Sequence, residues 1–136
     1  MTNINALLAY TAAHNIHVYG FELGNEKCGP PPALFANDYH ALHELLVKYW
    51  PDRSTRPLLI GNDCNTNPSY LTSFLPLVAD ILDVTTYHHY DGYGLDPKIA
   101  EKIMTPQYLD NTLSVALNGV HHKYAPRSQL WVGEAG

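Results

Sequence analysis

The sequence predicts an α/β fold, and more narrowly part of a (β/α)8 barrel, from three observations. Short apolar runs typical of buried strands alternate with longer segments of helical spacing, which implies a parallel sheet with right-handed crossovers. Polar residues follow every predicted strand, at the face where barrel enzymes do chemistry. Glu26 and Glu134 follow the first and last strands, 108 residues apart (134 minus 26), which is about three of the units that make up a barrel of about 250 residues. An open doubly wound sheet fits the alternation equally well, but the polar strand ends favour the barrel.

The first half of the chain is predicted to form a helix, a strand and a second helix. Residues 5–14 have helical spacing, and residues 18–23 form an apolar run that ends before Glu26. A glycine and three prolines at 29–32 predict a rigid loop without a helical option. Asn37 or Asp38 is expected to cap the next helix, which Pro51 ends.

The second half is predicted to continue the alternation. Residues 58–60 form a short strand that ends at Gly61-Asn62-Asp63, and residues 69–82 are helical with a break at Pro76. A third strand covers 84–87. Thr105 and Pro106 are expected to open a helix that continues to about residue 120, and 129–132 form the last strand.

Length and charge limit the class of protein. A chain of 136 residues can bury one core but is too short for a whole barrel, so we expect a fragment that is marginally stable, dimeric or aggregation-prone alone. The formal charge of −5 and 46% hydrophobic content are ordinary for a globular protein. Eight lysines and arginines are scattered rather than clustered, which argues against a nucleic-acid partner.

The two glutamates carry the functional prediction. A carboxylate just past a buried strand is poorly explained by packing, and a pair of them suits glycoside hydrolysis. Each glutamate also has a structural interpretation. Glu26 could be a solvated loop residue, and Glu134 could cap a helix that follows it.

Three segments carry a family resemblance: 22–26 (Glu-Leu-Gly-Asn-Glu), 83–90 (Asp-Val-Thr-Thr-Tyr-His-His-Tyr) and 130–134 (Leu-Trp-Val-Gly-Glu). They resemble the heparanase-like enzymes of glycoside hydrolase family 79 in order and spacing, over essentially the whole chain. The resemblance implies a fragment of one catalytic (β/α)8 barrel domain over 1–136, about strands four to seven with their intervening helices. It also implies a retaining β-glycosidase that hydrolyses β-glucuronide linkages in glycans or proteoglycans without a cofactor or metal.

The same resemblance implies partners and a location. These are a glycan or glucuronide substrate, the rest of the barrel and a β-sandwich domain, in a full-length protein that is secreted, extracellular, lysosomal or associated with a membrane. Two other interpretations stay open: a retaining glycosidase acting on neutral glycans, and a non-catalytic carbohydrate-binding half-barrel.

The resemblance also implies the catalytic roles. Glu134 is the nucleophile and Glu26 the general acid/base. Asn25 is expected to bind the sugar 2-hydroxyl, with a turn as its alternative. Tyr90 is expected to donate its hydroxyl to Glu134, with a rim aromatic as its alternative.

Two further substrate-binding candidates come from position along the strands. Adjacent strand residues point to opposite faces, so at most one of His88 and His89 faces the site, and His88 shares the face of Thr86 and Tyr90. Asp63 ends the intervening strand and either lines the cleft or forms a turn.

Cys28 and Cys64 lie on consecutive loops after predicted strands. A disulfide would suit a secreted protein, whereas unpaired thiols are the default expectation. Their spacing matches no compact metal motif, so no metal is expected.

Overall fold

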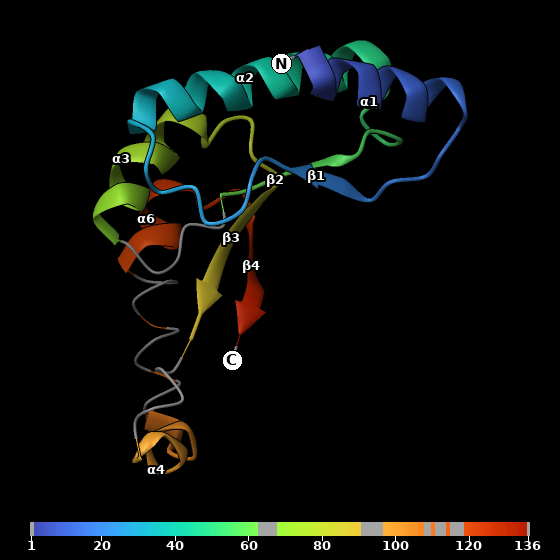
Figure 1. Cartoon of the computed structure of the whole chain (residues 1–136). Helices are drawn as coiled ribbons and strands as arrows, with labels where there is room; N and C mark the ends of the chain where they lie inside the picture. Colours follow the sequence, from blue (N-terminus) through green and yellow to red (C-terminus); the bar gives the residue numbers. More distant parts are fainter. Residues whose placement is uncertain are drawn as a thin grey trace.

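A computed structural model describes residues 2–135 except 63–67, 91–96, 108–109, 111–113 and 115–118. Figure 1 shows the elements in chain order. They are α1 (Thr2–Ala13), β1 (Gly20–Glu22), α2 (Pro32–Tyr49), β2 (Leu58–Ile60), α3 (Pro68–Val78), β3 (Val84–His89), α4 (Ile99–Ile103), α6 (His122–Tyr124) and β4 (Gln129–Ala135). The four strands form one parallel sheet in the order β1-β2-β3-β4. The predicted α/β class with a parallel sheet is therefore confirmed.

The sheet is curved, and contacts between strands that are not neighbours demonstrate it. The rings of Tyr19, just before β1, and Trp131, on β4, stack with centroids 6.1 Å apart. Thr86 on β3 donates a hydrogen bond to the Glu22 carboxylate on β1. In a flat sheet three strand spacings would separate β1 from β4 by about 14 Å. Alternate strands of a barrel place side chains in a shared interior layer, so this curvature is compatible with part of a barrel.

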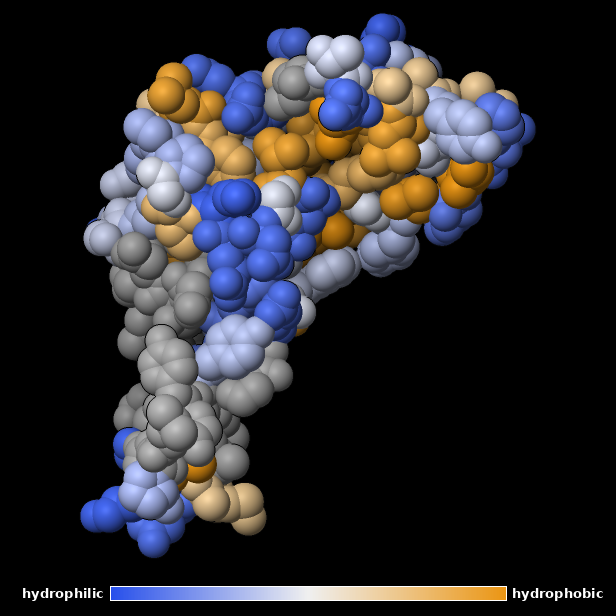
Figure 2. All heavy atoms as spheres, viewed as in Figure 1, coloured by the Kyte–Doolittle hydropathy of each residue, from blue (hydrophilic) through white to orange (hydrophobic). Residues whose placement is uncertain are grey.

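The apolar core lies between the sheet and helices α1, α2 and α3. Figure 1 shows α1 and α2 along one side of the sheet, and Figure 2 shows hydrophobic residues gathered over that part of the molecule. An aromatic cluster joins α2 to α3: Tyr39 and Phe74 meet edge to face at 5.3 Å, and Phe35 contacts both. Tyr39 and Phe74 are fully buried. Burial of apolar area contributes about 25 cal/mol per Å², so this cluster stabilises the packing of α2 against α3.

Polar groups at the amino ends of the strands join the strands to one another. The Asp83 side chain accepts a hydrogen bond from the Leu59 N–H at 2.9 Å and is paired with Arg53, while its own N–H donates to the Leu59 carbonyl at 3.0 Å. Ser128, just before β4, lies 2.8 Å from the Thr85 hydroxyl, and His121 donates to the Ser128 carbonyl at 2.9 Å. These contacts fix the strands at the end away from the glutamates.

Two element boundaries differ from the sequence prediction for physical reasons. Helix α2 begins at Pro32 after the N-cap residue Pro31, without a side-chain cap, so the expected caps Asn37 and Asp38 are wrong. Proline suits the first helical position because its missing N–H would have no partner there. Helix α3 also continues past Pro76 to Val78, where the sequence suggested a break.

Other boundaries shift by a few residues, and β4 runs to Ala135, so that Glu134 lies within the strand and not after it. Helix α4 was not predicted. Much of the predicted helix from Thr105 to residue 120 lies outside the described residues.

Candidate active site

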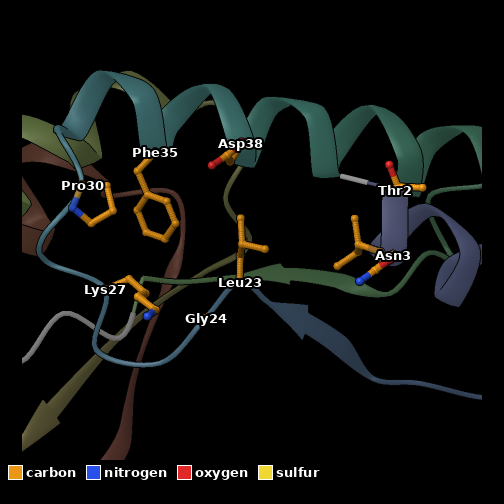
Figure 3. Close-up of a pocket in the computed structure, with 9 residues that line it drawn as sticks. Thr2, Asn3, Leu23, Gly24, Lys27, Pro30, Phe35 and Asp38 are labelled. Carbon is orange, nitrogen blue, oxygen red and sulfur yellow. The ribbon is translucent and has the colours of Figure 1, made fainter.

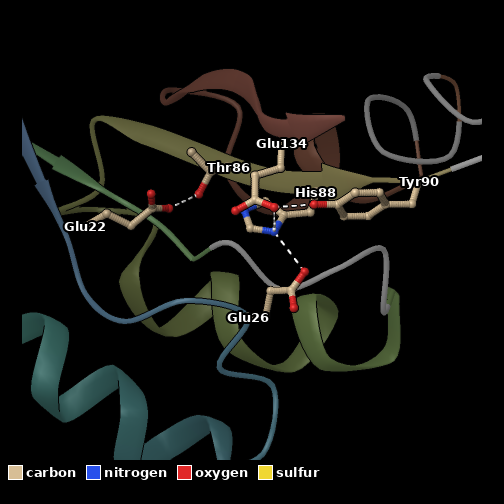
Figure 4. A network of polar contacts seen from close by, with 6 residues as sticks. All are labelled: Glu22, Glu26, Thr86, His88, Tyr90 and Glu134. Atoms are coloured by element: carbon tan, nitrogen blue, oxygen red, sulfur yellow. Dashed lines mark hydrogen bonds and ion pairs between the residues drawn. The ribbon is translucent and has the colours of Figure 1, made fainter. Parts of the chain in front are cut away.

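One cluster of titratable side chains lies at the carboxyl ends of the strands. Glu26, His88 and Glu134 each present one atom, and these atoms lie within 4.8 Å of one another. The loop after β1 supplies Glu26, β3 supplies His88 and β4 supplies Glu134. Figure 4 shows the two carboxylates turned towards the same imidazole, with Glu26 on the loop after one edge strand and Glu134 on the other edge strand. Two carboxylates that are distant in sequence therefore share one site.

His88 is the centre of this cluster. Its Nδ1 lies 3.0 Å from Glu26 Oε1 and 3.8 Å from Glu134 Oε2. The residue is 3% exposed, whereas the two glutamate side chains are 42% and 45% exposed. A buried ring between two accessible carboxylates can orient both of them towards a substrate.

Gly133 makes room for the imidazole. A Cβ at this position would lie 3.2 Å from both Nε2 and Cδ2 of His88, closer than ordinary van der Waals contact. The β3–β4 register shifts between Tyr87 and His88, which pairs His88 with Glu134. Sequence reasoning missed Gly133, although a glycine inside a strand is a known sign of close approach by another group.

Tyr90 donates its hydroxyl to Glu134 Oε2. This hydrogen bond, followed by smaller effects of burial and the nearby charges of Glu134 and Glu26, raises the pKa of Tyr90 above its usual value. The phenol therefore stays protonated at neutral pH and remains a donor to the carboxylate. Tyr90 is 47% exposed, so it lies at the rim of the cluster.

The loop that bears Glu26 has an unusual backbone. Glu26 has φ of +51°, in the left-handed region, and Gly24 has φ of +94°. A residue with a Cβ pays on the order of 1–2 kcal/mol to adopt this conformation. The Cys28 N–H donates to the Glu26 carbonyl at 3.0 Å and closes a tight turn.

Cys28 is disulfide-bonded, so the default expectation of an unpaired thiol is wrong for this residue. The chain has one other cysteine, Cys64, which is therefore the partner available within the chain. Cys64 itself lies outside the described residues.

Two of the remaining candidates, Asn25 and His89, are not brought into the cluster. Asn25 is exposed beside Glu26 and makes no hydrogen bond to the described part of the chain. Asp63 lies outside the described residues. His89, on the opposite face of β3 from His88, belongs to none of the contacts within the cluster.

A separate pocket of about 670 Å³ lies between the start of α1, the loop after β1 and the start of α2 (Figure 3). Leu23 and Phe35 supply apolar walls, and Lys27 and Asp38 supply opposite charges. None of its lining residues belongs to the Glu26–His88–Glu134 cluster. Some residues that line the pocket lie close to Glu26 in the sequence, but the pocket and the cluster share no residue.

Within the described residues, the same cluster is the only group of three or more His, Cys, Asp or Glu side chains close enough together to ligate one metal ion. Two carboxylates and one imidazole are possible ligands for several divalent cations. Glycoside hydrolysis also accounts for both carboxylates, and it needs no ion.

Comparison with known proteins identifies a family model that matches residues 1–136, described as the glycosyl hydrolase family 79 N-terminal domain. Heparanase-like protein 3 of Arabidopsis thaliana is 31% identical over 144 residues, covering 99% of this chain and 27% of the relative. Baicalin-beta-D-glucuronidase of Scutellaria baicalensis is 29% identical over 88% of this chain and 24% of the relative. Heparanase of Bos taurus is 29% identical over 98% of this chain and 26% of the relative. The chain thus spans about a quarter of the length of these proteins.

None of the described helices is both long enough and apolar enough to cross a bilayer.

Proposed function

We propose that this chain, which belongs to glycosyl hydrolase family 79, supplies both catalytic carboxylates of a retaining β-glycosidase. The observation that supports this proposal is that one carboxylate oxygen of Glu26 and one of Glu134 lie within 4.8 Å of each other. Retaining enzymes hold their carboxyl groups about 5–5.5 Å apart, whereas inverting enzymes need about 6.5–9.5 Å to seat a water between them. The spacing favours direct attack by one carboxylate on the sugar.

In the proposed mechanism Glu134 attacks the anomeric carbon. The bond from that carbon to the leaving oxygen breaks, and Glu26 donates its proton to that oxygen. Glu26 then removes a proton from water, the water oxygen bonds to the anomeric carbon, and the bond to Glu134 breaks. Tyr90 and His88 orient the Glu134 carboxylate through the contacts described above.

The finer assignments belong to the same proposal. We assign the four strands to positions four to seven of one barrel domain that includes residues 1–136. Asn25, Asp63, His88 and Tyr90 are assigned to contacts with the substrate or the nucleophile. A β-glucuronide is the proposed substrate, because a glucuronidase and a heparanase are among the relatives that match the chain.

The test uses the natural gene product that includes this chain, with aryl β-glucuronides as substrates. A 2-fluoro glucuronide should label Glu134 covalently, as peptide mass spectrometry would reveal. Glu26→Ala should lose about 10²–10⁴-fold in turnover of substrates with poor leaving groups and far less with activated ones, because only the former need a proton. Azide should restore turnover of Glu26→Ala and yield a β-glycosyl azide.

Glu44→Ala is the matched control, since Glu44 is an exposed glutamate on α2 and should retain full turnover. Labelling of another residue, or an α-configured azide product, would contradict the retaining mechanism. Equal losses on both substrate classes in Glu26→Ala would contradict the acid/base role.

A further inference from the structure

We propose that the disulfide at Cys28 positions the general acid/base, and that breaking it disables proton donation by Glu26 more than it disables the fold. The inference rests on the proposed function, because it assigns a positioning role to a residue that touches neither substrate nor reacting atoms. Cys28 stands two residues after Glu26 on the same loop.

The backbone of this loop does not favour the observed position by itself. Glu26 has a left-handed φ of +51°, which is unfavourable for a residue with a Cβ. Such backbone conformations persist only where contacts with the surrounding structure compensate for their energetic cost. Contacts around Glu26 must therefore supply that constraint.

The contacts of the Glu26 side chain constrain the loop only weakly. The Glu26 carboxylate contacts His88 Nδ1 at 3.0 Å, but 42% of its side chain is exposed. An exposed carboxylate can exchange such a contact for water at little cost. The imidazole alone therefore gives an incomplete account of why the loop keeps its conformation.

The backbone of Glu26 is constrained by its hydrogen bond with Cys28. The Cys28 N–H donates to the Glu26 carbonyl at 3.0 Å, so the position of Cys28 fixes the peptide group of Glu26. Cys28 is partly buried against the apolar core and is held by its disulfide. Its available partner, Cys64, follows β2 by four residues in the sequence, and β2 is hydrogen-bonded to β1. The disulfide thus restrains Cys28, and through the Cys28 N–H it restrains the turn that bears the acid/base.

The chemistry makes this attachment consequential. A general acid must lie within hydrogen-bond reach of the leaving oxygen, about 2.6–3.2 Å. A displacement of about 1 Å can reduce turnover by about 10²-fold. Glu134 lies on β4 and is held by the strand ladder, so loss of the cross-link should affect Glu26 and leave the nucleophile in place.

The experiment compares Cys28→Ser and Cys64→Ser in the natural gene product, each assayed on aryl β-glucuronides with a good and a poor leaving group. Both variants should lose roughly tenfold more turnover on the poor leaving group than on the good one, with little change in KM. Azide should yield glycosyl azide with both variants. The wild-type protein in dithiothreitol should acquire the same behaviour and lose it on reoxidation, while the variants should not respond to dithiothreitol.

Glu26→Ala, assayed alongside, separates the two proposals. If Glu26→Ala depends on the leaving group and the cysteine variants do not, only the positioning role is overturned. If Glu26→Ala loses both substrates equally, the proposed function itself fails. Parallel losses on both substrates in the cysteine variants, or loss of near-ultraviolet circular dichroism on reduction, would make the disulfide a stability element and overturn the inference.

Discussion

The two ends of the curved sheet use polar residues differently. At the amino ends, Asp83 and Ser128 accept and donate hydrogen bonds that join neighbouring strands. At the carboxyl ends, Glu26 and Glu134 are almost half exposed and direct their charges at a shared imidazole. One end therefore uses its polar groups to hold strands together, whereas the other leaves them partly exposed and able to contact a ligand.

This difference separates stability from chemistry. Polar groups that are satisfied within the protein contribute to folding but have no capacity left for a ligand. Partly exposed carboxylates contribute little to folding and can change partners during a reaction. Substitutions at the two ends should therefore move different measurements, and the following predictions test that separation in order of decreasing effect.

The largest effect is expected from His88→Ala, at the carboxyl end. Loss of the ring removes the contact shared by Glu26 and Glu134, and turnover should fall by about 10²-fold because both carboxylates lose their orientation. Steady-state kinetics would measure it. The matched control is His89→Ala, one residue along β3 on the opposite face, which should keep turnover near the wild-type value. An equal loss in the control would mean that packing of β3 matters and not the cluster.

At the amino end, Asp83→Ala should lower the free energy of unfolding by about 1–3 kcal/mol, because the buried Leu59 N–H loses its acceptor. Urea denaturation would measure the change, and turnover of the folded protein should be unaffected. Asp80→Ala, an exposed aspartate nearby, is the control. Arg53→Ala should cost less than about 1 kcal/mol, since the Arg53 side chain is 57% exposed. A change in leaving-group dependence in Asp83→Ala would contradict the separation of the two ends.

A smaller effect is expected from Gly133→Ala. The new methyl group would lie 3.2 Å from the His88 ring, so the ring must move by a few tenths of an ångström. Turnover should fall by about 3–10-fold, with no loss of melting temperature, because alanine is no worse than glycine in a strand. Gly119→Ala is the control, since its Cβ would meet open space. Full activity in Gly133→Ala would indicate that His88 tolerates displacement.

The smallest effect concerns pH. Burial lowers the pKa of His121, partly opposed by its hydrogen bond to Ser128, so the folded protein favours the neutral ring. The unfolded chain then binds more protons below the ordinary histidine pKa of about 6.5, and stability falls as the pH drops through that value. In His121→Gln, the fall in Tm as the pH drops through this value should be smaller by about 2 °C, measured by calorimetry. The exposed His17→Gln is the control, and a flattening there would argue against burial as the cause.

The accuracy of the sequence predictions differed between local patterns, such as apolar runs, proline positions and strand alternation. Strand β2 was predicted at 58–60 with its observed bounds, because an apolar run beside Gly61 admits few alternatives. The start of α2 was missed because three prolines indicate a loop as readily as a helix start. Alternation along β3 favoured His88 over His89.

Features set by tertiary context could not be predicted. A left-handed Glu26 is uncommon for a residue other than glycine, so nothing in the local sequence announces it. Gly133 beside His88 depends on the register of two strands more than forty residues apart in sequence. The sequence spacing of the two cysteines does not decide between a disulfide and unpaired thiols, so the disulfide at Cys28 could not be predicted.

The stacking of Tyr19 on Trp131 has a consequence for protein engineering. Because the contacts that join the first and last strands lie among the described residues of this chain, we expect the distance between Glu26 and Glu134 to be set largely within it. A chimera that joins this segment to strands of an unrelated protein should keep that distance. Recombination would then exchange the surrounding surfaces and keep the Glu26–Glu134 pair together on one segment.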